Sequence, residues 1–497
     1  MDEFEKPVTA HIEESLKKNN DGTHVDLQAA GCNQLQPRPS ADPNDPLNWT
    51  GFEKHTTLMI AVLMVFSGPF DGASPASGFN VQANDFGVPV ADMLESIGTQ
   101  SIMLGIGLFI WVPLSNRYGR KPIYLISAIT AMMGSLGCAL ANSLGGFIAG
   151  RMVNGFGCSG PMSLVSLTVK DLFFVHERGQ KMGLWTLFFG ISPYIGSLLD
   201  GVMTTYTSWR WMQWLTFFFW VFLTGGCLLM PETLYYRQAA PENIPLREPF
   251  WERVKLRRFE GDLTWHSFYR PITMVWYPSI LFPSVYYANV YGFSVYGFLG
   301  VLPFAFGELY GFNSVGQGLV TLAFLVGTII GEPMAGPFSD WIVQRQAKRS
   351  GGVRCPEQRL RAIWLGVVLL PISLILFGCT IHYHTHWIGP CIGMGLSAFA
   401  IQIISTVSVT YAIDCYDHAA GDVSLLYNFL RQLFSFYVPF YIHGYVTSVG
   451  YAWAFGIYAI ISMCLSLPLV ILNLYGTIIR NKLGHIYDAG QAEVEIT

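Results

Sequence analysis

Charged residues are scarce in this chain of 497 residues. Asp, Glu, Lys and Arg make up 12% of it, half of the ~25% that is usual in soluble domains. The hydrophobic share is 52%, the mean hydropathy is +0.38, and many apolar stretches reach the ~20 residues with which a helix crosses ~30 Å of hydrocarbon. The deficit of charge therefore excludes a string of soluble domains and predicts a polytopic membrane protein.

Motifs of several other classes of protein are also missing from the sequence. It contains no Walker A sequence for ATP, and its apolar stretches contain no Ser/His/Asp arrangement and no cluster of metal ligands. Its nine cysteines include no CxxC pair, and its first fifty or so residues include no apolar h-region of a signal peptide. We therefore expect no enzymatic activity, no metal, no cofactor, no nucleic-acid partner and no cleaved leader.

Twelve apolar stretches are long enough to be transmembrane helices, six before a polar segment and six after it. Prolines recur inside them, but neighbouring helices in a membrane bundle can satisfy the backbone groups that a proline frees. The predicted spans are 56–78, 93–115, 122–142, 144–168, 183–203, 210–230, 272–301, 315–337, 361–380, 387–412, 421–446 and 450–476.

The positions of Lys and Arg predict the orientation of these spans. All of them except Arg151, Arg210 and Arg431 fall in the N-terminal segment, in the tail, or in connections that follow even-numbered spans. Because Lys and Arg are retained on the cytoplasmic side, we expect both termini to be cytoplasmic. The predicted parts are a polar N-terminal segment (1–55), a six-helix bundle (56–230), a cytoplasmic central loop (231–271), a second six-helix bundle (272–476) and a cytoplasmic tail (477–497).

The turn between the second and third spans, in WVPLSNRYGRKPIYL (111–125), is more specific than a generic basic loop. Its basic residues hold a cytoplasmic hairpin in place. Its spacing resembles the loop signature G-x-L-a-D-r-x-G-r-k of the major facilitator superfamily, with Val112 in place of the first Gly and Asn116 in place of the Asp. The matching residues are Leu114, Arg117, Gly119, Arg120 and Lys121.

Further stretches strengthen this resemblance. A second copy of the loop, Gly336-Pro337-Phe338-Ser339-Asp340-Trp341, follows the eighth span and keeps the Gly and the Asp but lacks the basic cluster. The fourth span contains Arg151-Met-Val-Asn-Gly155-Phe-Gly157, which is similar to the R-x-x-x-G-x-G of the superfamily. DPNDPLNW (42–49) and YAIDCYDHAAGD (411–422) resemble the fungal twelve-span drug:proton antiporter branch.

The resemblance implies an all-α membrane protein with two pseudo-symmetric six-helix bundles around a central cavity, which opens alternately to each side of the plasma membrane. It further implies a functional monomer in the lipid bilayer, with a small organic substrate and protons as its partners. In the family, the acid of the loop signature helps to hold one state of the transport cycle. Asn116 cannot carry that charge, so either Asp340 takes over more of this task or the carrier switches state more readily.

A proton gradient is the expected source of energy, and the resemblance favours export of a drug, toxin or secondary metabolite, as by a multidrug efflux pump. The antiporter signature of the fifth span is only partly kept, since Pro193 and Gly196 remain but Ser192 and Ser197 stand where glycines are expected. Proton-coupled uptake of a small organic cation is therefore an alternative. A transporter-like nutrient sensor is a second alternative. Such sensors usually carry a long signalling tail, whereas the predicted segment after the last span is short.

Ionisable residues inside spans cost ~2.5–3.5 kcal/mol each on insertion scales, and each is a candidate for proton coupling. Asp71 in the first span and Arg151 in the fourth lie at nearly the same depth of a ~30 Å core. We predict that they form a protonation-sensitive pair. The alternative places Asp71 at the outer interface and lets Arg151 bind backbone carbonyls. Asp200 and Glu332, near the ends of their spans, are further candidates.

Arg431 lies about ten residues into the eleventh span, near the midplane. It either faces the cavity and sets the charge preference for the substrate, or pairs with Glu332, Asp414 or another acid of the second half. Aromatic side chains in the seventh and eleventh spans suit amphiphilic or cationic organic molecules, although an interfacial aromatic belt would use the same residues. The candidates for the cavity are Tyr286, Tyr287, Asn289, Tyr291, Tyr427, Asn428 and Arg431.

Overall fold

The computed structural model describes residues 40, 42–235, 250–255, 265–349, 356–416 and 419–483. Within these ranges all regular structure is helical and no strand is present. The predicted N-terminal segment and tail, the central loop and the stretch at 411–422 lie partly outside the described residues.

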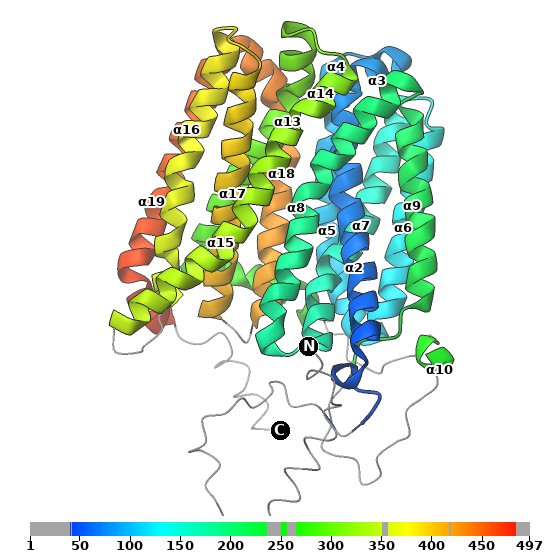
Figure 1. Ribbon diagram of the computed structural model, residues 1–497, viewed down its shortest axis with the longest axis vertical. Helices are drawn as coiled ribbons and strands as arrows, with labels where there is room; N and C mark the ends of the chain where they lie inside the picture. The colour runs from blue at the N-terminus through cyan, green and yellow to red at the C-terminus, as the bar shows by residue number, and fades with distance from the viewer. Residues whose placement is uncertain are drawn as a thin grey trace, which may run out of the picture. The chain divides into compact units, whose positions relative to one another are not determined.

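Six long helical segments form the first half of the bundle, and each coincides with a predicted span (Figure 1). They are α2 (Gly51–Ala73) with its continuation η2 (Ser74–Ser77), α5 (Glu95–Tyr118), α6 (Arg120–Leu140), α7 (Leu144–Leu172), α8 (Val175–Tyr206) and α9 (Arg210–Leu229). The shorter helices of this half are η1 (Pro46–Asn48), α3 (Phe79–Phe86) and α4 (Val90–Met93).

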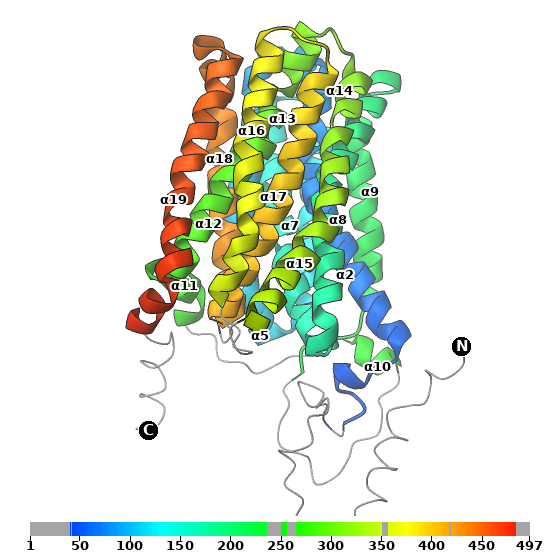
Figure 2. The same cartoon turned by 60° about the vertical axis from the view of Figure 1, so that its left-hand side comes forward.

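The second half contains six further long segments that run alongside the first six (Figure 2). The first is a continuous rod with two π-helical stretches, α12 (Pro278–Tyr291), η4 (Gly292–Tyr296), α13 (Gly297–Leu302) and η5 (Pro303–Leu309). The others are α14 (Ser314–Val320) with α15 (Leu322–Arg349), η6 (Pro356–Ala362) with α16 (Ile363–His382), α17 (Ile388–Cys415), α18 (Ala420–Val449) and α19 (Tyr451–Leu483). Between the halves lie α10 (Phe250–Val254), α11 (His266–Thr273) and η3 (Met274–Trp276).

Ten of the described helical segments are long and apolar enough to cross a membrane. The two long helices that fall short are α7 and α18, which carry Arg151 and Arg431 together with many small, hydroxyl or amide side chains. Both arginines are buried. Small and polar residues are typical of helix surfaces that contact other helices, so the lower hydropathy of α7 and α18 reflects their inner position. The predicted fold class of an all-α membrane protein is confirmed.

Helix ends are set by local chemistry that the sequence displays. Thr50 caps α2, because its hydroxyl accepts from the Glu53 N–H while the Glu53 carboxylate accepts from the Thr50 N–H. A single residue, Gly119, links α5 to α6 with a φ of 98°, a conformation that favours glycine. The basic turn between these helices is therefore as tight as a connection can be.

The two halves close against each other at one of the two ends of the bundle. The end at which α2 begins and α19 ends is called here the terminal end (Figures 1 and 2). At the opposite end, η5 of the second half packs on α3 of the first, where a Cβ on Gly307 would lie only 2.7 Å from Asn80 Nδ2. Further in, Ser101 Oγ of α5 and Tyr296 Oη of η4 are hydrogen-bonded at 2.8 Å. The opposite end is thus closed by contacts between the halves.

Candidate functional site

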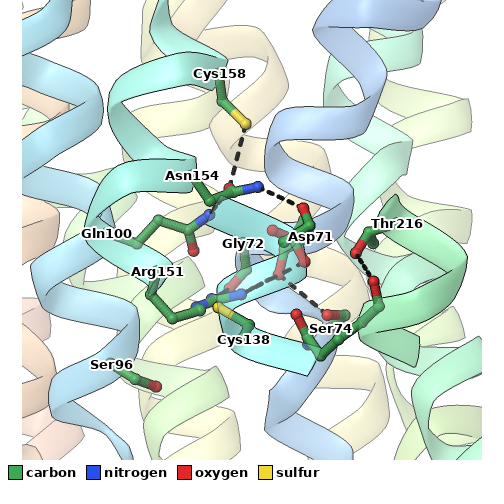
Figure 3. Close-up of polar contacts among 12 residues, drawn as sticks. Asp71, Gly72, Ser74, Ser96, Gln100, Cys138, Arg151, Asn154, Cys158 and Thr216 are labelled. Carbon is green, nitrogen blue, oxygen red and sulfur yellow. Dashed lines mark hydrogen bonds and ion pairs between the residues drawn. The ribbon is translucent and has the colours of Figure 1, made fainter. Parts of the chain in front are cut away.

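The interior of the first half holds a buried ion pair between Asp71 of α2 and Arg151 of α7 (Figure 3). Arg151 Nη1 lies 3.7 Å from Asp71 Oδ1, and both side chains are 0% exposed. Nη1 and Nη2 also donate to the backbone carbonyl oxygens of Asp71 and Gly72, each at 2.6 Å. The two side chains are thus paired, and Arg151 also binds backbone carbonyls, which is one part of the alternative; the protonation sensitivity of the pair stays a prediction.

The carboxylate of Asp71 relies on Arg151 for compensation. Neither of its oxygens accepts a hydrogen bond from the described residues. Thr216 of α9 lies beside it, but the Thr216 hydroxyl donates to the carbonyl oxygen of Gln213 at 2.8 Å. Because a buried charge is costly unless it is paired, the charge state of this carboxylate is tied to the position of Arg151.

A polar network that the sequence analysis did not single out fixes α7 next to the pair. Asn154, one turn beyond Arg151, accepts from Gln100 Nε2 of α5 at 2.9 Å. The Asn154 amide also donates to Ser135 Oγ of α6 at 2.9 Å (Figure 3 labels Asn154 and Gln100). An amide on the same helix, three residues after an intramembrane arginine, is the sequence signal that could have pointed to this network.

The glycine of the fourth-span motif brings α7 close to α5. A Cβ on Gly155 would lie 2.5 Å from the backbone oxygen of Gln100, so a larger residue would force the helices apart. The conformational role predicted for Gly155 itself is not tested by this contact. The contact does show why Arg151, one turn earlier, can reach the end of α2.

Asp200 of α8 lies in the interior of the first half and is 0% exposed. A Cβ on Gly78 would lie 2.7 Å from Asp200 Oδ2 and 2.8 Å from Thr204 Oγ1, and Gln82 is buried next to them. Only a glycine permits this approach. Asp200 is therefore enclosed by the protein next to polar side chains of α3 and α8, and its role in proton coupling stays a prediction.

The partly kept signature of the fifth span packs α8 against α2. A Cβ on Gly196 would overlap the carbonyl oxygen of Phe70. Ser197 Oγ is hydrogen-bonded to Ser77 Oγ at 2.6 Å, and Ser192 Oγ donates to the carbonyl oxygen of Phe189 at 2.9 Å. Both serines that replace expected glycines therefore have partners, and the close approach of the two helices is retained through Gly196.

A cavity of about 920 Å³ lies between the two halves and extends toward the terminal end. Its walls come from α5, α7 and α8 of the first half and from α12, η4, α15, η6, α17 and α18 of the second. This volume is within the range of sites that bind drug-sized molecules. The sequence-predicted residues that line it are Pro193, Tyr287, Tyr291, Glu332, Gly336, Asp340, Tyr427, Asn428 and Arg431.

Two predicted cavity residues do not line it. Tyr286 is 1% exposed and packs in the apolar core of the second half, and Asn289 donates to the Val285 carbonyl oxygen of its own helix at 2.9 Å. With 3.6 residues per turn, Tyr287 and Tyr291 share one face of α12, whereas Tyr286 and Asn289 share another. Neither of these two residues therefore lines the cavity in this structure.

Arg431 projects from α18 into this cavity and is 4% exposed. Its guanidinium lies 4.5 Å from the ring centroid of Phe189 and 5.0 Å from that of Tyr291, and Nη1 donates to Tyr287 Oη at 3.3 Å. It forms no ion pair with an acid of the described residues. The two acids suggested as its partners are engaged elsewhere, Glu332 by the amide of Gln402 and Asp414 by Arg359. Pairing of Arg431 with either acid is therefore wrong.

In the first signature loop the positive charge of Arg120 is still paired with an acid, although Asn116 replaces the acid of the motif. Arg120 Nη1 donates to Asn116 Oδ1 and to Ser115 Oγ, each at 2.7 Å, and its Nε lies 3.4 Å from Asp171 of α7. Arg117 is partly exposed and lies over the ring of Tyr118. The carboxylate that the motif lacks is thus supplied within the same half.

Glu232, which follows α9, caps the helix that begins at this loop. Its two carboxylate oxygens accept from the backbone N–H groups of Arg120 at 2.9 Å and Lys121 at 3.1 Å. Lys121 Nζ in turn donates to the Leu228 carbonyl oxygen at 2.7 Å. Burial raises the pKa of Glu232 above its usual value, whereas the N–H donors and the charge of Arg120 oppose this shift.

The second signature loop has a separate network in its own half. Arg359 lies 3.0 Å from Asp340 of α15 and 2.9 Å from Asp414 of α17, and so bridges the ends of two helices. Close by, Arg480 pairs with Glu357 at 3.5 Å. Asp340 therefore contacts residues of the second half in this state, and whether it takes over the task of Asn116 stays a prediction.

Comparisons with known proteins agree with this architecture. The family model of the Major Facilitator Superfamily matches residues 57–439. The chain is 28% identical to the MFS-type transporter atr4 of Stereocaulon alpinum, over 93% of this chain and 86% of that protein. It is 26% identical to the probable efflux pump mfs2 of Aspergillus flavus, over 82% and 98% of the two chains, and 26% identical to the efflux pump radE of Floropilus chiversii, over 88% and 83%. The chain belongs to the major facilitator superfamily of membrane transporters.

Proposed function

We propose that this transporter exports a small organic compound in exchange for protons, with both termini in the cytoplasm and the plasma membrane as its location. One observation carries the proposal: Asp71 and Arg151 form a fully buried ion pair beside the packed α2–α8 contact. A carboxylate enclosed in this way is a candidate for proton uptake and release. Two of the relatives are named as efflux pumps, which supports export as the direction of transport.

The geometry suggests how protonation would act on the helices. Arg151 holds α2 through two backbone carbonyls and one carboxylate. A proton on Asp71 removes the negative charge and leaves the guanidinium with the carbonyls alone, which makes this arrangement less favourable for a buried cation. The equilibrium between carrier states then shifts toward one in which Arg151 finds other partners.

Proton movement in inside-out vesicles tests the function. The interior of the vesicles is made acidic, and organic compounds of different charge are added at the cytoplasmic face. Export by antiport makes the lumen more alkaline as substrate enters, whereas uptake by symport, running in reverse, makes it more acidic. Binding of a compound without any coupled proton movement would support the alternative of a transporter-like nutrient sensor.

Two variants make this measurement specific. Asp71→Asn keeps the size of the side chain and is expected to abolish coupled proton movement. Asp92→Asn removes an acid from the short helix α4 and is expected to leave coupling within about twofold of the unmodified protein. Full coupling in Asp71→Asn would exclude this residue from the mechanism.

A further inference from the structure

The charged side chains that line the cavity are not equally compensated. Arg359 is paired with Asp340 and Asp414, and the Glu332 carboxylate accepts from the Gln402 amide. Lys181, near the terminal end, lies 3.1 Å from His55 Nε2. The full set of charged lining residues is Lys181, Glu332, Asp340, Arg359 and Arg431.

Arg431 is the deep positive charge of this set, and most of its hydrogen-bonding capacity is unused. A guanidinium has five N–H donors. One donates to Tyr287 Oη at 3.3 Å, a second points to the weak acceptor Met162 Sδ at 3.8 Å, and Nε has no partner among the described residues. Its two other neighbours, Phe189 and Tyr291, offer only ring faces.

These neighbours fix the guanidinium and leave its charge uncompensated. Stacking on two rings holds the plane of the group, and a buried cation without an acid is costly unless a ligand supplies the negative charge. A carboxylate matches the forked donors of Arg in a bidentate arrangement. The flanking aromatic side chains would at the same time cover a flat apolar body attached to that acid.

We infer that the cavity binds organic anions, namely apolar, preferably aromatic molecules with one carboxylate, and that the carboxylate is bound by Arg431. The inference rests on the proposed function, because it assigns the class of substrate that the exporter carries. It disagrees with the alternative of a small organic cation as the substrate, since such a cation in this cavity would meet the charge of Arg431 at close range. Glu332 is the acid that such a cation would need; its carboxylate accepts from the neutral Gln402 amide, and a cationic probe tests whether this acid or Arg431 sets the preference.

Three probes that share one ring system and differ in charge test this inference. Binding of 1-naphthylacetate, of its neutral primary amide and of the cationic 2-(1-naphthyl)ethylamine is measured by calorimetry on the full-length protein in lipid nanodiscs. We expect the acid to bind at least tenfold more tightly than the amide, and the amine to bind most weakly. Equal affinities, tighter binding of the amine, or no measurable binding of the acid at millimolar concentration would overturn the inference.

Variants connect the preference to Arg431. Arg431→Gln is expected to bind acid and amide equally, whereas Arg431→Lys is expected to keep part of the preference. Arg210→Gln is the matched control, because it removes a positive charge that is paired with Asp85 and does not line the cavity. An acid preference that survives in Arg431→Gln would show that another group binds the anion.

These measurements are made at equilibrium and without a gradient, so their failure is distinct from failure of the proposed antiport. Binding of the acid without coupled proton movement would leave the anion site standing and refute the antiporter. Coupled proton movement with no preference for the acid would refute the anion site and leave the proposed antiport standing. Thermal unfolding of each variant, compared with the unmodified protein, shows whether a lost preference reflects the site or a lost fold.

Discussion

At the scale of single residues, the arrangement around Arg151 separates two tasks. Its hydrogen bonds to the carbonyl oxygens of Asp71 and Gly72 join α7 to the last turn of α2, while its ion pair neutralises the Asp71 carboxylate. The first task depends on the donors of the guanidinium and the second on its charge. Substitutions that remove one and keep the other can therefore tell structure from coupling.

A double-mutant cycle measures the pair. Arg151→Gln leaves the Asp71 carboxylate buried without a counter-ion, and we expect it to lower the free energy of unfolding by about 3–5 kcal/mol. Asp71→Asn in the same chain is expected to recover part of that loss, because no buried negative charge then remains. Unfolding in detergent, followed by circular dichroism, provides the comparison. Purely additive effects of the two substitutions would show that the side chains do not interact.

We expect the stability of the protein to depend on pH through the carboxyl group of Glu232. Its pKa is raised in the folded protein, so it contributes stability at low pH that is lost as the pH rises and the buried carboxyl ionises. Between about pH 5 and about pH 8, we expect the melting temperature of Glu232→Gln to fall less than that of the unmodified protein. The difference is read from melting curves at several pH values. Parallel curves would contradict the assignment.

At the scale of elements, α7 is the helix on which most of the site depends. It carries Arg151 and Asn154, contacts α5 and α6 through glycines, and is one of the two long helices that are not apolar enough by composition to cross a membrane alone. Its polar groups are satisfied by neighbours, so it requires those neighbours in order to be stable in lipid. A helix that is not apolar enough to cross a membrane alone thus carries the arginine that pairs with Asp71.

The close contact at Gly155 predicts a sharp effect of size. Gly155→Val would place side-chain atoms against the Gln100 backbone, and we expect it to lower the free energy of unfolding by about 1–3 kcal/mol and to weaken coupled transport. Gly145→Val is the matched control, since a Cβ there would meet nothing within 4 Å. Both variants are compared by thermal unfolding and by vesicle assay. Equal behaviour would mean that α7 and α5 can separate without cost.

Much of this element order could be predicted from the sequence, because apolar length reports directly on membrane spans. The long helices lie where the hydropathy indicated. The similar depths of Asp71 and Arg151 also predicted that their side chains pair, as they do in the structure. The partners of Arg431 and the packing of Tyr286 in the apolar core of the second half could not be predicted, because they depend on which helix faces converge. The extension of the seventh span to Leu309 was missed as well, since its last turns are π-helical and reach beyond the predicted end at 301.

At the scale of the whole molecule, the two halves are closed against each other at the end opposite to the termini, while the cavity extends toward the terminal end. A hydrogen bond between Ser101 and Tyr296 crosses from one half to the other. Each signature loop, by contrast, forms its ion pairs inside its own half. The contacts between the halves at the closed end thus differ from the ion pairs of Arg120 and Asp340, which join residues of the same half.

Tyr296→Phe tests that view of the closed end. Loss of one hydrogen bond removes about 0.5–1.5 kcal/mol from the contact between the halves, so we expect a larger fraction of molecules open at this end. Spin labels at positions 84 and 309 report the separation as a distance distribution. Tyr310→Phe is the control, because among the described residues the Tyr310 hydroxyl donates to the carbonyl oxygens of Thr385 and Thr380, which belong to its own half. An unchanged distribution in Tyr296→Phe would show that this bond does not favour the closed end.

The lack of an acid beside Arg431 also bears on the energy source. If the cargo is a monoanion and one proton enters as it leaves, each cycle carries two elementary charges in the same electrical direction. A membrane potential, negative inside, then contributes about 2.3 kcal/mol per charge per 100 mV in favour of export. For a monovalent cation exchanged with one proton the same voltage contributes nothing. An arginine that meets no acid would thus let the cell expel its cargo by voltage even where no pH difference remains.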